Sequence, residues 1–212
     1  MKLRIAGLLV VMVALFAGTA SAQPMVSYGV TAGWGLASLS FDDDELNDAL
    51  SDMRNGLDVG AFVEVPMGDS MSFVIAGKYA QRGAKGSFTE GGQTFDATVK
   101  LDVIDIPLLV NFPFNTMSSV RPFVYAGGVP AFKVSAKETF KGPGVDEEED
   151  IEDIKSYDFG LMFGGGVQFG GRYGVAVDYN LGLVNLNDDS TEDLSVKSRQ
   201  LVIRFIVSLS RQ

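Results

Sequence analysis

The stretch "YDFGLMFGGGVQFGGRYGVAVDYNLGLVNL", residues 157–186, decides the fold of this chain. Its bulky apolar residues recur at every second position, as in Phe159, Leu161 and Phe163, and small or charged residues stand between them. Period-two alternation indicates β-strands, and Gly170, Gly171 and Arg172 indicate a short turn between two of them. Because the second face is mostly glycine with isolated charges, the stretch predicts the wall of a small barrel with a crowded polar lumen and lipid outside.

The same alternation recurs along the rest of the chain. It predicts eight strands, at residues 28–36, 57–65, 71–82, 94–114, 120–138, 157–169, 173–183 and 200–209. Short turns join the second strand to the third, the fourth to the fifth and the sixth to the seventh, and long loops make the other connections. This rhythm is typical of an all-β, eight-stranded antiparallel up-and-down transmembrane β-barrel.

The sequence also predicts two long loops and two irregular positions within the strands. Residues 83–93 and the acidic segment 141–153 are expected to be loops. Pro107 lies inside the fourth strand and has no amide hydrogen, so a missing hydrogen bond or a bulge is expected there. In the fifth strand the apolar residues change phase, and a bulge near residues 127–130 is the expected cause.

The N-terminus has the features of an export signal. Lys2 and Arg4 precede an apolar run from Ile5 to Phe16, and the small residues at 20–22 suit a signal peptidase. We therefore expect a cleaved signal peptide at residues 1–22 and an outer-membrane β-barrel domain at residues 23–212. The chain contains no cysteine, so neither a disulfide nor a lipid-modified cysteine can form.

Charge and composition narrow the function. The formal net charge is −10, which argues against nucleic acid as a partner, and 17 of the 27 acidic residues lie in the windows 42–55, 139–153 and 186–194. These acidic loops are candidates for divalent cations, and solvated loops without a fixed metal geometry are the favoured alternative. The chain has no histidine, the commonest general base, and we predict neither a catalytic site nor a cofactor nor a metal site; the protein is expected not to be an enzyme.

Charged residues at the alternate positions are expected to meet inside the barrel. Isolated buried charges are costly, so opposite charges should pair there. We expect Glu64 to pair with Lys78 or Arg82, and Arg204 to pair with Asp178 or Asp58. The predicted lumen charge network consists of Asp58, Glu64, Lys78, Arg82, Asp105, Asp158, Asp178 and Arg204. A structural plug is the favoured interpretation, and a narrow ion-selective path is the alternative.

Three segments together resemble a known family. "DVIDIPLLVNF", "VRPFVYAGG" and the opening stretch are similar to the PorT-like outer-membrane β-barrel domain, a porin-like family of Bacteroidetes-type bacteria. The resemblance covers residues 29–209 and implies an outer-membrane barrel. It implies no specific activity.

The sequence therefore predicts a small barrel of the bacterial outer membrane, in contact with outer-membrane lipid. A structural or surface-interaction role with a plugged lumen is the first hypothesis. The second is a narrow channel or a transport or secretion accessory. The third is a soluble periplasmic lipocalin-like ligand binder, which would need its apolar face turned inward.

Overall fold

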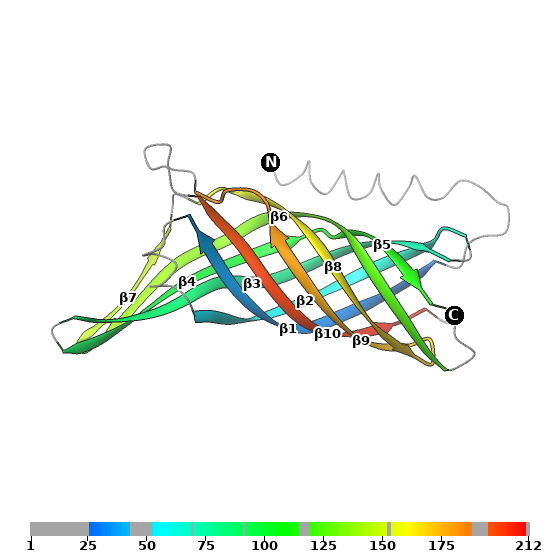
Figure 1. Ribbon diagram of the computed structural model, residues 1–212, viewed down its shortest axis with the longest axis horizontal. Coiled ribbons are helices and arrows are strands. Elements are labelled where there is room, and N and C mark those ends of the chain that lie inside the picture. The colour runs from blue at the N-terminus through cyan, green and yellow to red at the C-terminus, as the bar shows by residue number, and fades with distance from the viewer. Residues whose placement is uncertain are drawn as a thin grey trace.

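The computed structural model describes residues 26–42, 52–68, 70–90, 92–114, 119–151, 154–187 and 195–210, and all of its regular structure there is β-strand (Figure 1). The ten strands are β1 (Ser27–Phe41), β2 (Asp52–Pro66), β3 (Ser72–Glu90), β4 (Gln93–Asp105), β5 (Leu108–Pro113), β6 (Val120–Gly142), β7 (Val145–Asp150), β8 (Tyr157–Phe169), β9 (Tyr173–Gly182) and β10 (Val196–Ser208). No helix in these ranges is long and apolar enough to cross a membrane.

The strands form a closed antiparallel ring. β4 and β5 occupy successive parts of one position between β3 and β6, and β7 pairs only with the end of β6, so the ring has eight positions. Strands in consecutive ring positions are neighbours throughout, and β1 pairs with β10 from Gly29↔Ser208 to Phe41↔Val196, which closes the barrel. The eight-stranded up-and-down barrel expected from the sequence is confirmed.

The two ends of the barrel differ. At one end, which we call the turn end, short connections follow β2, β5 and β8. The first strand, β1, begins at this end, and the last strand, β10, finishes there. In the opening stretch, Gly170 and Gly171 turn the chain with φ values of 53° and 66°, which favours glycine at both positions. The opposite end, the loop end, carries the longer connections. The expected signal peptide lies outside the described residues, as do residues 43–51 and 188–194 of two acidic loops.

The apolar face of each strand points outward. Trp34, Phe163 and Phe205 are 64%, 51% and 62% exposed, whereas the alternate residues Asp178 and Arg204 are buried. In water such an apolar surface would be unfavourable, but it suits the hydrocarbon core of a membrane. This sidedness is opposite to the one that a soluble lipocalin-like barrel requires.

The expected irregularity at Pro107 is confirmed. β4 ends at Asp105 and β5 begins at Leu108, so the fourth predicted strand is interrupted where proline cannot donate a hydrogen bond. The ladder is restored around the gap, because Ile106 N donates to Pro130 O at 2.8 Å and Ala76 N donates to Pro107 O at 3.0 Å.

The prediction of a bulge near residues 127–130 is wrong. β6 pairs with β8 without a register shift from Val120 to Phe132, so the odd-numbered Phe123 and Tyr125 point into the lumen. The shift lies further along, where Asp102 pairs with Ser135 and Val103 pairs with Lys133, leaving Val134 as the extra residue. The apparent change of phase arose because two aromatic residues were taken for part of the outward face.

Two segments expected to be loops are β-hairpins instead. β3 continues to Glu90 and turns at Gly92 into β4, and β6 continues to Gly142 and turns at Gly144 into β7. Both hairpins extend the sheet beyond the barrel at the loop end (Figure 1). Their strands carry only isolated bulky apolar residues, such as Phe95 and Phe140, so they lack the repeated apolar alternation by which the barrel strands were recognised.

Candidate functional site

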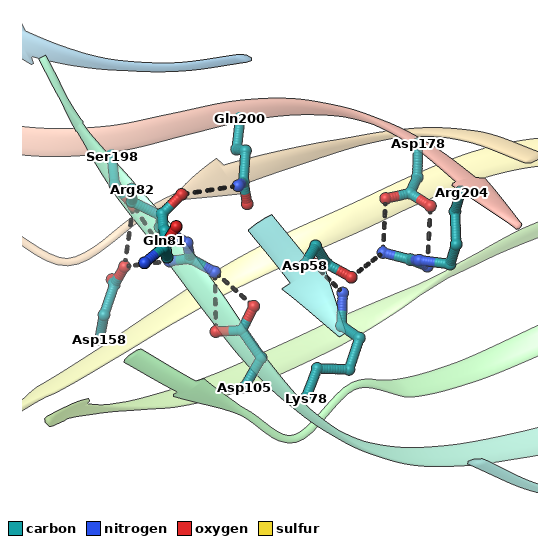
Figure 2. A network of polar contacts seen from close by, with 10 residues as sticks. All are labelled: Asp58, Lys78, Gln81, Arg82, Asp105, Asp158, Asp178, Ser198, Gln200 and Arg204. Atoms are coloured by element: carbon teal, nitrogen blue, oxygen red, sulfur yellow. Dashed lines mark hydrogen bonds and ion pairs between the residues drawn. The ribbon is translucent and has the colours of Figure 1, made fainter. Parts of the chain in front are cut away.

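Seven of the eight charges predicted to face the lumen meet in its middle, in two neighbouring groups that we together call the lumen network (Figure 2). They come from β2, β3, β4, β8, β9 and β10, and each is at most 6% exposed. Four are acids, Asp58, Asp105, Asp158 and Asp178, and three are bases, Lys78, Arg82 and Arg204.

Arg204 is the centre of the first group. Its Nη1 lies 2.8 Å from Asp178 Oδ1, and its Nη2 donates to Asp178 Oδ2 at 3.0 Å and to Asp58 Oδ1 at 3.2 Å. Lys78 Nζ donates to the other oxygen of Asp58 at 2.9 Å, and Tyr125 OH donates to Asp178 Oδ1 at 2.6 Å. The guanidinium thus joins two carboxylates, both of them expected partners of Arg204.

Arg82 is the centre of the second group. Its Nη2 donates to both oxygens of Asp105, at 2.8 and 2.7 Å, so a single nitrogen of the guanidinium makes two short charge-assisted hydrogen bonds. Its Nη1 donates to Asp158 Oδ2 at 3.4 Å and to Ser198 Oγ at 3.3 Å, and Ser198 Oγ donates to the same carboxylate at 3.0 Å. This group lies nearer the loop end than the first.

Glu64 lies outside the network, and its expected pairing with Lys78 or Arg82 is wrong. It lies near the turn end, where it accepts hydrogen bonds from Ser72 Oγ and, at 3.0 Å, from Asn111 Nδ2. Alternation places a residue on a face, but the partner depends on strand register and tilt, which the sequence does not show.

Two participants were missed at the sequence level. Tyr125 had been counted among the outward aromatic residues of the fifth predicted strand, and the uncharged Gln200 was not among the residues predicted for the lumen network. Gln200 Nε2 donates to Gln81 O at 3.2 Å across the lumen, so it supports the backbone of β3 where the pairing between β2 and β3 shifts register. Inward polar residues of this kind could be found from alternation alone, but not their partners.

Apolar side chains fill the lumen on the loop side of the network. Leu39, Leu101, Ala136 and Leu186 belong to one buried cluster, and Leu186 comes from the connection between β9 and β10. This segment is held by Leu186 N, which donates to Val196 O at 2.8 Å. The lumen is therefore closed twice, by paired charges and by an apolar cluster.

The acidic run of β7 is neutralised in part by lysines. Glu148 lies 2.7 Å from Lys100 Nζ and 2.8 Å from Lys137 Nζ, and it belongs to a strand rather than a mobile loop. Within the described ranges no group of three or more acidic residues is arranged to hold a metal ion. Asp146 pairs with Lys141 at 3.5 Å.

Hydrogen bonds from Lys100 and Lys137 lower the pKa of Glu148 from 4.5 to about 2. Because the folded-state pKa is depressed, the pairing is complete above about pH 4.5 and is lost as the pH falls towards 2. A carboxyl-carbon NMR titration should give a midpoint near 2, and Lys100→Met should move it back towards 4.5. Lys141→Met is the control, because Lys141 lies nearby and pairs with Asp146 instead of Glu148. A wild-type midpoint near 4.5 would contradict the pairing of Glu148 with the two lysines.

A closed ring of eight antiparallel strands with an apolar outer face and charges in its lumen defines an outer-membrane β-barrel. The chain belongs to the family of the outer membrane protein beta-barrel domain, which matches residues 20–188. The protein is therefore located in the bacterial outer membrane. No curated relative matches the sequence.

Several solved structures are similar to this chain at low sequence identity. Ail, the attachment invasion locus protein of Yersinia pestis, is 15% identical, with 86% of this chain and 98% of Ail covered and a TM-score of 0.43. Neisserial surface protein A is 16% identical, with 86% and 97% covered and a TM-score of 0.44. The outer membrane enzyme PagL is 13% identical, with 84% and 98% covered and a TM-score of 0.39.

Proposed function

We propose that the protein is a non-conducting barrel of the outer membrane with a structural or surface-interaction role. The observation that carries this proposal is the double closure of the lumen. Seven charges pair inside the lumen, where Arg82 of β3 also reaches Asp158 of β8, and the cluster around Leu101 and Leu186 fills the space beyond them. A small barrel closed in this way offers ions no continuous aqueous path.

The proposed orientation places the turn end in the periplasm and the loop end outside the cell. Short periplasmic turns and long outer connections are the rule for such barrels. The β3–β4 and β6–β7 hairpins would then stand on the cell surface, where their polar side chains are available for contact with other molecules. Within the broader family, the segments at residues 102–112, 120–128 and 157–186 favour the PorT-like group.

The outward apolar face is the surface that would meet outer-membrane lipid. The acidic residues of β7 are proposed to remain solvated and lysine-paired, with divalent cations as weak partners at most. The proposed role is non-enzymatic, although PagL shows that the architecture can also serve an enzyme.

Cysteine labelling tests the orientation, because the natural chain contains no cysteine. Ser87→Cys on the β3–β4 hairpin and Ser70→Cys at the β2–β3 turn are a matched pair at exposed positions. A membrane-impermeant maleimide should label the first in intact cells and the second only after lysis. Labelling of Ser70→Cys alone in intact cells would reverse the orientation and remove the surface role from the hairpins.

A further inference from the structure

A cavity of about 130 Å³ lies in the lumen on the turn side of the network. Its wall is more apolar than the interior of a small membrane barrel needs to be, since such interiors are commonly polar. The larger apolar side chains that line it include Phe62, Val74, Leu109, Phe123 and Ile206. The stacked rings of Phe123 and Tyr125, with centroids 6.0 Å apart, form one side.

The inner end of the cavity is closed by Lys78 and Arg204, whose charges are already compensated. Lys78 Nζ is bonded to Asp58, and the guanidinium of Arg204 is turned towards Asp58 and Asp178 (Figure 2). The hydroxyl of Tyr125 is likewise used by Asp178. An apolar group can therefore lie against this end without leaving a charge unpaired.

The open end of the cavity is polar and carries a cation. Arg121 is exposed at the start of β6, with Gln168 of β8 as its register partner, and both line the cavity. Arg121 has no ion-pair partner within the described ranges. Glu64, the acid among the lining residues, already accepts hydrogen bonds from Ser72 and Asn111. The exposed guanidinium of Arg121, without an ion-pair partner among the described residues, is suited to bidentate recognition of a carboxylate.

We propose that this cavity binds small carboxylates with a compact apolar body. The body lies between Phe123 and Leu109, and the carboxylate stays at the mouth on Arg121. An apolar cavity of about 150 Å³ accepts benzene, so the available space suits a body of about six carbons. The combination of an apolar wall with one placed charge is typical of small-molecule sites.

Binding can be measured by ¹⁹F NMR with 4-fluorophenylacetate and the full barrel in lipid nanodiscs, where no detergent chain competes for the cavity. We expect saturable binding of the carboxylate, with the corresponding amide and amine at least about tenfold weaker. Arg121→Gln should weaken the carboxylate about tenfold, the effect of losing one partly exposed charged hydrogen bond, and should abolish its advantage over the amide.

A cavity-filling pair of variants separates this site from partition into lipid. Ala76→Leu enlarges a lining residue and should abolish binding, whereas Ala61→Leu, on the outward face of β2, should bind as the wild type does. An SDS-gel mobility that shifts on boiling shows that each variant is folded. The proposal is overturned if the three probes bind alike, if Ala76→Leu binds like the wild type, or if no probe saturates and the cavity holds water only. None of these results depends on the orientation or the conductance of the barrel.

Discussion

Replacing Arg204 with methionine is expected to lower the free energy of unfolding of the barrel by about 3–5 kcal/mol, the loss typical of breaking a buried ion pair. The substitution leaves Asp58 and Asp178 buried. Among the described residues, Asp178 then loses the one cation that pairs with it, and Asp58 keeps only Lys78. Urea unfolding in lipid vesicles measures the loss, and the single tryptophan, Trp34, reports it from the outer face.

Arg199→Met is the matched control for that experiment. Arg199 lies on the same strand as Arg204 but points outward and is exposed, so its removal should change the unfolding free energy by no more than about 0.5 kcal/mol. Equal losses in the two variants, or no loss in Arg204→Met, would show that the paired charges do not hold the barrel together.

Replacing Gly164 with valine is expected to destabilise the barrel by about 3 kcal/mol, at the upper end of overpacking. Gly164 lies opposite Asp178 in the β8–β9 hairpin, and a Cβ there would lie 2.6 Å from Val177 O and 2.7 Å from Asp178 Cβ. Neither can move without disturbing the ladder or the ion pair with Arg204. Urea unfolding together with the heat-dependent gel shift measures the effect.

Gly77→Val is the control for Gly164→Val, because a Cβ at Gly77 meets no atom within 4 Å. The φ of Gly77 is also outside the left-handed region that favours glycine. Valine favours strands, so Gly77→Val should leave stability unchanged or slightly raised. A loss at Gly77 as large as that at Gly164 would mean that the close approach of Gly164 to Asp178 is not what requires glycine there.

Much of the fold could be predicted because the alternation of apolar with polar or small residues along a strand indicates which face of the sheet each residue occupies. Phe159, Leu161 and Phe163 lie outward and Asp178 inward, as the opening stretch indicates. The interruption at Pro107 was equally predictable, because a missing amide hydrogen is a property of the residue itself. These features depend on local chemistry, which each segment carries alone.

The remaining features depend on how segments meet. The partners of Glu64 and the contact of Tyr125 with Asp178 require the register between non-adjacent strands. The segment of β7 was expected to be a solvated loop because it is a run of acidic residues without apolar alternation. The lysines that pair with Glu148 in this run, Lys100 and Lys137, belong to other strands. A single run of acidic residues does not show what lies beside it in the sheet.

The closure of the lumen is tested most directly by the conductance of the purified wild-type protein in planar lipid bilayers. The paired charges of the lumen network and the apolar cluster beyond it predict no current steps above those of the bare bilayer in concentrated KCl. Steady ohmic steps that increase in number with the amount of inserted protein would contradict the account and favour a narrow channel.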